Sequence, residues 1–409
     1  MADDLAVWLN GLRVAVITRE RSRLRMTYTH EALERYDLGT PVLSLSLPLT
    51  AEPYPQGVLR AFLDGLLPEG EPRRIIARDF GVRDSDTFGL IRELGRDCAG
   101  ALIVQLADEP EPVRATTRTA DPLHDKELDE LVVNLRSAPL GAGARVRISL
   151  AGVQEKLLLT RMPDGAWGRP VDGTPSTHIL KPEIAAYPMT VENESFCMRF
   201  AKHLGLDVAS VDTTDIAGRK LIVIERYDRI VHDDGSVERL HQEDFCQATG
   251  TPPDQKYEDD GGPSLRTVAN ILQSAARADA VEALLRAVMV NVLIGNGDAH
   301  AKNFSLLHQP SGALHLAPLY DLVSSLFYGD DRLAMHIDNV RRSNRVTADR
   351  IVNEAAGWGL SRRRARGIVE DVIARSPAAI AAAREETEGL PADIPGLVEQ
   401  QLARLRGAV

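Results

Sequence analysis

The stretch Gly295–Ser325 places an acidic residue at each end of a predicted β-hairpin. The first strand, the turn and the return strand of this hairpin are expected at Asn303–His308, Gln309–Gly312 and Ala313–Ala317. Upstream, the apolar run Ala283–Ile294 predicts a helix that ends at Gly295. Asp298 therefore opens a loop that is anchored on a buried helix, and Asp321 follows the second strand.

Asp298 and Asn303 have the D-x-x-x-x-N spacing of a kinase catalytic loop. In such a loop the Asp accepts the proton of the attacking hydroxyl, and the Asn side chain holds a magnesium ion. Because a hairpin folds back on itself, an Asp just after its second strand can bind the same metal, and Asp321 in Tyr320–Val323 has this place. The stretch therefore predicts phosphoryl transfer.

Two other interpretations of these residues remain open. An Asp beside a Gly commonly makes a turn, and an Asp-Leu pair commonly caps a helix, so both acidic residues can be purely structural. Asp298, His300 and His308 can also be ligands of a hydrolytic metal, although the sequence has no second His/Asp cluster to complete the shell. The crowding of His300, Lys302 and Asn303 into one short loop between buried elements favours the catalytic interpretation.

The whole chain has the composition of an ordinary globular protein. Its 409 residues suggest two or three domains, and its 44% hydrophobic and 26% charged residues are typical of a soluble fold. The net charge of −11 excludes a generic nucleic-acid binder, so a contact with DNA needs a local basic patch or a partner. Cys98, Cys197 and Cys246 lie far apart and indicate buried thiols of a reducing compartment. With no signal peptide and no apolar run near 18 residues, we expect a cytoplasmic protein outside the membrane.

Four successive regions are expected along the chain. Residues 1–106 form a compact unit that begins with a hairpin around Asn10-Gly11, and because no catalytic spacing occurs there we interpret it as a structural or partner-docking module. Residues 107–125 are rich in Pro, Thr and charge and predict a linker. Residues 126–230 and 231–409 follow as two lobes, the second mostly helical.

Within residues 126–230, two segments are candidates for binding phosphates. The segment 145–160 predicts two strands around Ala151-Gly152, a small-residue turn whose N–H groups can approach a phosphate closely; a plain hairpin is the alternative, because neither G-x-G-x-x-G nor a Walker A sequence is present. The strand 177–181 ends in Lys181, which is either a surface lysine or the ATP-binding lysine of a kinase. A helix at 191–204 follows, and we favour its Glu194 over Glu192 as the partner of this lysine.

Four further segments complete the pattern. Lys220–Asp228 is an apolar strand that becomes polar at Glu225, which suits a hinge beside an adenine ring. The polar segment 251–264 (TPPDQKYEDDGGPS) predicts a mobile surface loop. Two basic clusters predict either solvated faces or a patch that faces DNA: Arg341, Arg342 and Arg345, then Arg362, Arg363, Arg364 and Arg366.

Several short motifs of this sequence occur together in one known family. They are SLSLPL, FLDGLLPEG and ELGRDCAGAL in residues 1–106, then RISLAGVQEK, STHILKP, ERYDR, QEDFCQ, YEDDGGPS, GNGDAHAKNFS and PLYD. On these motifs the sequence resembles the HipA family of toxin kinases along nearly its whole length. The resemblance implies an α+β fold: a bilobal, protein-kinase-like (phosphatidylinositol-kinase-like) body with an extra N-terminal α/β subdomain and an all-helical C-terminal lobe.

The resemblance also assigns roles to individual positions. Asp298 looks like the catalytic base, Asn303 and Asp321 like the magnesium ligands, and Ser149 like a serine whose autophosphorylation switches such kinases off. Charges added at Ser149, beside a phosphate-binding turn, would repel ATP. The positions that match the family's ATP contacts are Ala151, Gly152, Val153, Gln154, Glu155, Lys156, Lys181, Glu225, Arg226, Tyr227, His300, Ala301, Lys302, Asn303, Tyr320 and Asp321.

By this resemblance the function is that of a serine/threonine kinase that uses ATP and Mg²⁺. It would act as the toxin of a toxin–antitoxin pair and phosphorylate a translation component such as an aminoacyl-tRNA synthetase. The expected partner is a helix-turn-helix antitoxin of the HipB type, through which the complex would bind operator DNA. The alternative is a non-catalytic, kinase-like co-repressor scaffold, against which the presence of Lys181, Asp298, Asn303 and Asp321 argues.

Overall fold

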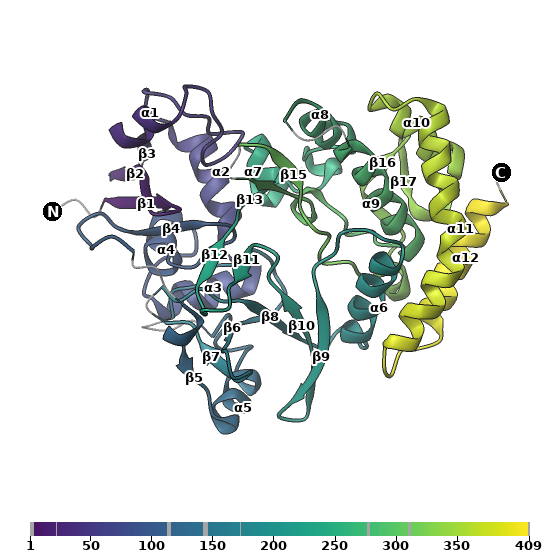
Figure 1. The fold of residues 1–409 in the computed structure, drawn as a ribbon, viewed down its shortest axis with the longest axis horizontal. Coiled ribbons are helices and arrows are strands. Elements are labelled where there is room, and N and C mark those ends of the chain that lie inside the picture. Colours follow the sequence, from purple (N-terminus) through teal and green to yellow (C-terminus); the bar gives the residue numbers. More distant parts are fainter. Residues whose placement is uncertain are drawn as a thin grey trace. The chain divides into compact units, whose positions relative to one another are not determined.

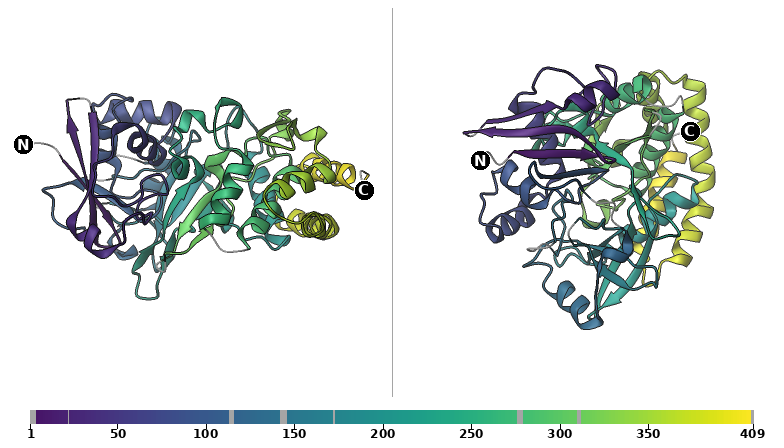
Figure 2. Two further views of the ribbon diagram at one scale, coloured as in Figure 1. Left: turned by 90° about the horizontal axis from the view of Figure 1, so that it is seen from above. Right: turned by 60° about the vertical axis from the view of Figure 1, so that its left-hand side comes forward.

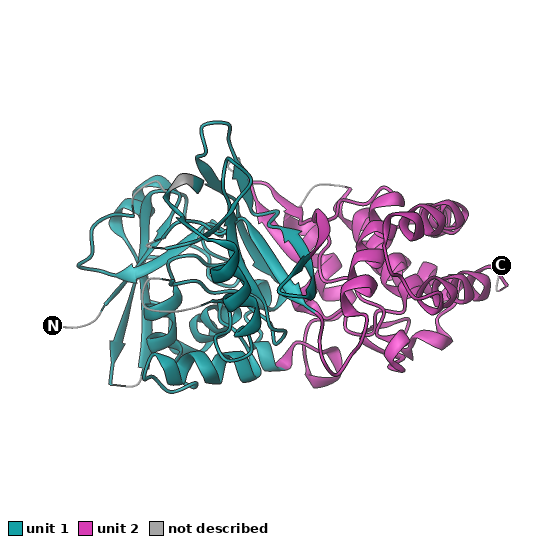
Figure 3. Cartoon of the chain, turned by 90° about the horizontal axis from the view of Figure 1, so that it is seen from below, with its two compact units in different colours: residues 1–182, 215–254 teal, residues 183–214, 255–409 magenta. Residues whose placement is uncertain are grey.

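The computed structural model describes residues 4–21, 23–112, 116–141, 146–171, 173–275, 279–309 and 312–407. The chain forms two compact units, each built from two stretches of sequence (Figure 3). Unit 1 comprises residues 1–182 and 215–254, and unit 2 comprises residues 183–214 and 255–409. The division into four regions expected from the sequence stays a prediction.

Unit 1 begins with a four-stranded sheet in the order β3-β2-β1-β4 (Figure 1). The predicted hairpin at Asn10-Gly11 is confirmed, because both residues have positive φ angles, 50° and 80°, and Leu9 pairs with Leu12. The strands and helices of this part are β1 (Leu5–Leu9), β2 (Leu12–Glu20), β3 (Arg23–Tyr28), β4 (Leu102–Leu106), α1 (His30–Arg35), α2 (Gln56–Leu66), α3 (Gly70–Asp79) and α4 (Thr87–Leu94).

A large apolar core joins the first sheet of unit 1 to the segment that follows it. Helix α2 buries Leu59, Phe62, Leu63 and Leu66, the i, i+3, i+4, i+7 positions of one helix face. The same core continues from the first sheet to residues of the following segment, Ile148, Leu158 and Val171 among them. The N-terminal part of the chain is therefore packed into the unit that carries the expected phosphate turn.

The second sheet of unit 1 has the strand order β5-β7-β6-β8-β10-β9 (Figures 1 and 2). In the antiparallel pair β8–β10, Lys181 lies opposite Ile222. Its strands are β5 (Asp121–Pro122), β6 (Leu157–Arg161), β7 (Trp167–Arg169), β8 (His178–Pro182), β9 (Val211–Ile216), where the chain re-enters unit 1, and β10 (Arg219–Glu225). The remaining elements of unit 1 are α5 (Asp125–Val133), β11 (Arg229–Val231), β12 (Val237–Arg239), β13 (His241–Asp244), α7 (Phe245–Thr249) and two 3₁₀ turns, Thr117–Thr119 and Pro253–Gln255; the second of these turns runs to the unit boundary.

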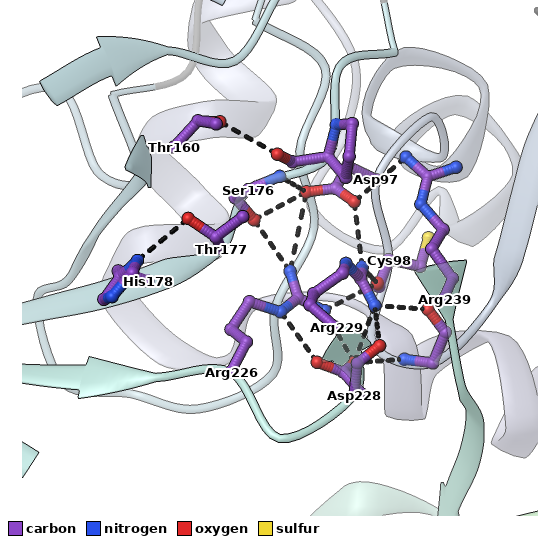
Figure 4. A network of polar contacts seen from close by, with 12 residues as sticks. Asp97, Cys98, Thr160, Ser176, Thr177, His178, Arg226, Asp228, Arg229 and Arg239 are labelled. Carbon is purple, nitrogen blue, oxygen red and sulfur yellow. Dashed lines mark hydrogen bonds and ion pairs between the residues drawn. The ribbon is translucent and has the colours of Figure 1, made fainter. Parts of the chain in front are cut away.

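A buried network of charges lies between the end of α4 and the segment after β10 (Figure 4). The Arg226 guanidinium lies 2.8 Å from Asp228 Oδ2, and Arg229 Nη2 lies 2.9 Å from Asp97 Oδ1. Arg239 adds a third cation, 3.3 Å from the same Asp97 oxygen. Burial alone would raise the pKa of both carboxyl groups, but the arginines outweigh it and hold each pKa below its ordinary value.

We expect Asp228→Asn to lower the free energy of unfolding by about 3–5 kcal/mol, because it leaves Arg226 and Arg229 in a dry site without one of their counter-charges. Asp338→Asn is the control, since Asp338 pairs with Arg350 at the surface and its loss should cost under about 1 kcal/mol. Urea unfolding followed by circular dichroism measures both. Equal, small losses for the two variants would show that the buried arginines do not need the Asp228 charge.

Unit 2 is built around long helices with two small hairpins. Helix α11 packs against α6, α9, α10 and α12 (Figure 1). The helices are α6 (Thr190–His203), α8 (Leu265–Ala275), α9 (Ala280–Ile294), α10 (Ala348–Gly357), α11 (Arg362–Glu386) and α12 (Asp393–Arg406). The hairpins are β14 (Ser305–His308) with β15 (Leu314–Leu316) and β16 (Arg332–Ile337) with β17 (Val340–Arg342), and 3₁₀ turns lie at Glu258–Asp260, Ala301–Asn303, Leu326–Tyr328 and Ser343–Arg345.

The expectation of an all-helical C-terminal lobe is wrong. Residues 231–409 contain β12 to β17 beside the helices, because short segments, β14 with β15 and β16 with β17 among them, pair through backbone hydrogen bonds as antiparallel strands. The predicted hairpin after Asn303 is confirmed in its strands, while Pro310 and Ser311 of its turn lie outside the described residues. In the described part of the chain, no helix is both long and apolar enough to span a membrane.

The two basic clusters are largely neutralised within unit 2. Carboxylates lie within 2.6–3.1 Å of four of their arginines, in the pairs Arg341–Asp259, Arg342–Asp331, Arg364–Glu282 and Arg366–Asp349. These pairs are those of solvated faces whose charge is balanced locally. They favour the interpretation of the basic clusters as solvated faces over that of a patch that faces DNA.

Candidate active site

The loop that carries Asp298 starts where α9 ends. Gly295 terminates the helix in the left-handed conformation, with φ of 64°. Beyond it, Asn296 Nδ2 donates to Asn291 Oδ1 at 2.9 Å, and Asn296 Oδ1 accepts from the Asp298 N–H at 3.0 Å. Asn291 and Asn296 are both buried. The main chain of Asp298 is therefore tied to the last turn of a buried helix.

Gly297 lies in a place that only a glycine can occupy without movement of its neighbours. A Cβ atom there would lie 2.2 Å from the Arg332 carbonyl oxygen and 2.8 Å from Ser325 Oγ. The backbone uses this close approach, because Gly297 N–H donates to Ser325 Oγ at 2.7 Å and the Gly297 carbonyl accepts from Ala334 N–H at 2.9 Å. The loop is thus held between β16 and the segment after Asp321.

Asn303 closes the loop on Asp298. Its Nδ2 donates to the Asp298 carbonyl at 3.1 Å, and its N–H donates to the His300 carbonyl at 2.9 Å. The intervening residues form the 3₁₀ turn Ala301–Asn303. Four residues between Asp298 and Asn303 are therefore just enough to turn the chain back, and the predicted spacing has a geometric basis.

Asp321 is connected to this loop through its neighbour Tyr320. The Tyr320 hydroxyl lies 2.7 Å from the Lys302 carbonyl and 2.7 Å from Ser305 Oγ. Asp321 itself has a positive φ of 57°, a left-handed conformation that few non-glycine residues adopt. The hairpin β14–β15 thus returns the chain to the loop, as the sequence predicted.

A buried asparagine of α6 holds the segment after Asp321. Asn193 Nδ2 donates to the Ser324 carbonyl at 3.1 Å, and its Oδ1 accepts from the Ser324 N–H at 2.8 Å. Both residues are fully buried. The amide side chain satisfies both backbone groups of Ser324, so this segment has one arrangement on the helix.

The carboxylates of the site influence each other. Asp298 is exposed as a residue, but its carboxyl group lies against neighbouring protein, and this burial raises its pKa above the ordinary value. A hydrogen bond from Tyr257 acts in the opposite direction, and the charge of Asp321 raises the pKa further. Burial and nearby Lys256 lower the pKa of His300 to about 3, so its imidazole is neutral at neutral pH.

These groups fit a magnesium ion. Asn303 and Asp321 supply amide and carboxylate oxygens, and Mg²⁺ prefers one or two such carboxylates together with water and substrate phosphates. The repulsion between Asp298 and Asp321 marks a place of negative potential that a divalent cation would relieve. Among the described residues no group of three His, Cys, Asp or Glu side chains could hold a metal, so a hydrolytic site of Asp298, His300 and His308 finds no support.

The predicted phosphate turn lies in unit 1. Gly152 has a φ of 116°, which favours glycine, and Lys156 Nζ donates to the Ala151 carbonyl at 2.7 Å across the turn. The turn also contacts the N-terminal part of the chain, since Glu69 N–H donates to the Gly152 carbonyl at 3.1 Å. The remaining predicted members, Val153, Gln154 and Glu155, follow in the same turn.

Ser149 is fully buried just before this turn. Its hydroxyl donates to the Leu66 carbonyl at 2.6 Å, and its N–H donates to the Asp97 carbonyl at 3.0 Å. A phosphate cannot be added to a hydroxyl in this position unless the segment first leaves it.

Lys181 is also buried, with 6% of its surface exposed. This burial argues against a surface lysine with its ammonium in water. Glu192 and Glu194 lie in α6 of unit 2, and both are buried. The pairing of Lys181 with Glu194 stays a prediction.

The expected hinge divides into residues with different surroundings. Glu225 is exposed at the end of β10, and the Tyr227 hydroxyl donates to Gln242 Oε1. Arg226, in contrast, has its guanidinium in the buried network and its N–H bonded to the Thr177 carbonyl at 2.9 Å (Figure 4). The structure gives the Arg226 side chain a place in the fold, which leaves Glu225 and Tyr227 as the better candidates for a nucleotide contact.

Two family models match this chain: the HipA N-terminal domain over residues 5–105 and the HipA-like C-terminal domain over residues 148–380. The second match alone spans more than half of the 409 residues. The chain belongs to the HipA family.

Relatives of this HipA-family kinase match it over most of their length. The protein Y4mE of Sinorhizobium fredii is 40% identical over 400 residues, which cover 95% of this chain and 94% of the relative. The serine/threonine-protein kinase toxin HipA of Shewanella oneidensis is 34% identical over 338 residues, covering 78% and 76%. A solved complex of Shewanella oneidensis HipA with HipB and operator DNA has a TM-score of 0.82 and 28% identity over 99% of this chain and 96% of that one. The mixed α/β fold is therefore that of HipA.

One contact of this HipA-family site was not predicted from the sequence. The Tyr257 hydroxyl donates to Asp298 Oδ1 at 2.6 Å, from the segment expected to be a mobile surface loop. In the structure this segment forms the 3₁₀ turn Glu258–Asp260, and Gly262 N–H donates to the Tyr257 carbonyl at 2.9 Å. The paired glycines of YEDDGG were the signal of a tight turn, but nothing in the sequence pointed from that turn to Asp298.

We expect Gly297→Ala to lower both stability and kinase activity of this HipA-family chain, because its methyl group would overlap the Arg332 carbonyl and displace the loop of Asp298. Overpacking of this kind costs about 1–3 kcal/mol. Gly367→Ala is the matched control, since Gly367 lies in α11 with open space around it and should tolerate or favour alanine. Urea unfolding and label transfer from ATP measure the two effects. If Gly297→Ala behaves like Gly367→Ala, the close approach at Gly297 has no functional weight.

Proposed function

We propose that this chain is an ATP- and magnesium-dependent serine/threonine protein kinase and the toxin of a toxin–antitoxin pair. The observation that carries the proposal is the closed turn from Asp298 to Asn303, to which Tyr320 connects Asp321. A base and two oxygen ligands in one segment are the parts that phosphoryl transfer needs. The kinase names of HipA relatives support the same reaction.

Each residue of the site has a distinct part in the proposed reaction. Asp298 orients the acceptor hydroxyl and takes its proton, while Asn303 and Asp321 would hold Mg²⁺, which supplies neutralisation of phosphate charge when bound. Lys181 and the turn Ala151–Lys156 would hold the phosphates of ATP, and Glu225 and Tyr227 would contact the adenine. His300, Ala301 and Lys302 lie in the loop that Asn303 closes and would border the nucleotide.

The finer description of the fold belongs to this proposal. A bilobal body like that of the phosphatidylinositol kinases would comprise residues 126–230 and 231–409, after an N-terminal subdomain at 1–106 and a linker at 107–125. The match of residues 5–105 to the HipA N-terminal domain supports the first boundary.

The proposed partners follow from the relative of known structure. That complex contains HipA, HipB and operator DNA, which supports a helix-turn-helix antitoxin of the HipB type for this chain and contact with DNA mainly through it. The local pairing of the basic clusters agrees with an indirect contact. We propose a cytoplasmic translation component, such as an aminoacyl-tRNA synthetase, as the protein substrate.

Asp298→Asn tests the base directly. We expect it to lower label transfer from radioactive ATP to bacterial lysate proteins by about 10²–10⁴-fold, because the amide cannot take the acceptor proton. Binding of Mg-ATP should persist, so the rise in melting temperature that Mg-ATP causes in the wild type should remain. Transfer at the wild-type rate would show that another group is the base.

The thermal shift also separates the kinase from the co-repressor scaffold. A kinase-like scaffold that has lost nucleotide binding would show no shift with Mg-ATP in either wild type or variant. A shift that requires Mg²⁺ and is weakened in Asp321→Asn would assign the metal to the predicted ligands.

Autophosphorylation at Ser149 is a separate proposal. We expect Ser149→Ala to abolish label incorporation into the chain itself while it still phosphorylates lysate proteins. It should also lower the free energy of unfolding by about 1–3 kcal/mol, because the buried Leu66 carbonyl loses its donor. Mass spectrometry of the labelled protein and urea unfolding measure these effects, and undiminished self-labelling of the variant would place the modification elsewhere.

A further inference from the structure

The Tyr257 side chain forms a hydrogen bond with the Asp298 carboxylate. Its hydroxyl donates to Oδ1 at 2.6 Å, a short, charge-assisted hydrogen bond. The Tyr257 ring also meets the His300 ring edge-on, with 5.3 Å between centroids. The phenol is therefore oriented by its ring as well as by its hydroxyl.

The segment that carries Tyr257 is anchored by two carboxylates to the hairpin β16–β17. Glu258 accepts from the His336 N–H at 2.7 Å and lies 3.4 Å from His336 Nδ1. Asp259 lies 3.2 Å from His336 Nε2 and 3.1 Å from Arg341 Nη1. One imidazole thus lies between two acidic side chains, and the two residues that follow Tyr257 in the chain are fixed to the hairpin β16–β17.

The backbone of this segment is equally constrained. Asp260 N–H and Gly262 N–H both donate to the Tyr257 carbonyl, at 3.0 and 2.9 Å. A Cβ atom at Gly262 would lie 2.3 Å from the Gln255 carbonyl oxygen, so the turn closes tightly on itself. On the other side, Ala301 N–H donates to the Lys256 carbonyl at 3.5 Å, which connects the segment to the catalytic loop.

We propose that Tyr257 is a positioning residue that fixes the orientation of the Asp298 carboxylate, so that Oδ2 is presented to the acceptor hydroxyl. This inference rests on the proposed function, in which Asp298 is the base.

The other hydrogen bonds of the loop do not fix the direction of the Asp298 carboxylate. Hydrogen bonds from Asn303, and to Asn296, fix the main chain of Asp298, but they leave rotation of its side chain open. A carboxylate has two equivalent oxygens, and Asp321 lies close enough to repel it. With Oδ1 occupied by the phenol, one oxygen and one direction remain for the acceptor.

The phenol could instead occupy the acceptor's own place, as an internal substitute that must leave before substrate binds. The anchoring of Glu258 and Asp259 argues against this, because displacement of Tyr257 would break their contacts with His336 and Arg341 together. The two roles predict opposite effects when the hydroxyl is removed.

Tyr257→Phe provides the test, because it removes the hydroxyl and keeps the ring against His300. We expect kcat for label transfer from ATP to lysate proteins to fall about ten- to a hundredfold, the effect of losing a hydrogen bond to a charged group that orients a reacting side chain. The KM for ATP and the melting-temperature rise with Mg-ATP should stay within about twofold of the wild type. Tyr54→Phe, which removes a phenol hydroxyl bonded to the Pro48 carbonyl in unit 1, is the control and should keep wild-type kcat.

The outcomes separate this inference from the proposed function. Wild-type kcat in Tyr257→Phe, beside an inactive Asp298→Asn, would overturn the positioning role and leave the base in place. A higher kcat in Tyr257→Phe would show that the phenol blocks the acceptor site, which also overturns it. Full activity of Asp298→Asn would show that another group is the base, and an absence of label transfer by the wild type would refute the proposed function itself, whatever Tyr257→Phe does.

Discussion

The hydrogen bond from Asn303 Nδ2 to the Asp298 carbonyl is the contact on which the candidate site depends. It closes a turn whose far side is a buried helix end, so the position of Asp298 follows from the packing of α9 rather than from the loop alone. It also commits one end of the Asn303 amide to the backbone, which directs the other end, the oxygen, away from it. A single amide thereby fixes the main chain of the proposed base and the direction of a proposed metal ligand, which explains why the spacing between the two residues is so short.

Much of this arrangement was predictable because its determinants are local. The hairpin at Asn10-Gly11, the buried face of α2 and the turn from Asp298 to Asn303 each depend on residues within a few positions of one another. Tyr257 was not predictable in the same way, since 41 positions separate it from Asp298 and its own segment is polar. Arg226 was not predictable for a different reason. Its residue type suggests a ligand contact or an exposed surface, whereas the fold buries it with Asp97 and Asp228.

The buried charges around Arg226 affect how the two sheets of unit 1 are held together. Asp97 lies between α4 and β4, a strand of the first sheet. Arg226, Arg229 and Arg239 come from the segment after β10, a strand of the second sheet. Ion pairs of this kind add little net stability when they replace apolar packing, because desolvation of the charges offsets their attraction. Their effect is on geometry: three fork-shaped guanidinium groups and two carboxylates satisfy one another in few arrangements, so the two sheets meet in one way.

Ser149 is held by contacts with Asp97 and with α2. Its N–H is bonded to the Asp97 carbonyl and its hydroxyl to the Leu66 carbonyl, so the residue before the proposed phosphate turn is held by the N-terminal part of the chain. A phosphoryl group at this position would bring about two negative charges into a fully buried site. It would also remove the hydroxyl hydrogen that is donated to the Leu66 carbonyl, and it would need more space than the hydroxyl has. The segment would then have to leave, and with it the turn at Gly152, whose carbonyl is bonded to Glu69 N–H. The proposed switch at Ser149 would therefore act through contacts made by the N-terminal domain, which would give that domain a part in holding the proposed nucleotide turn in place.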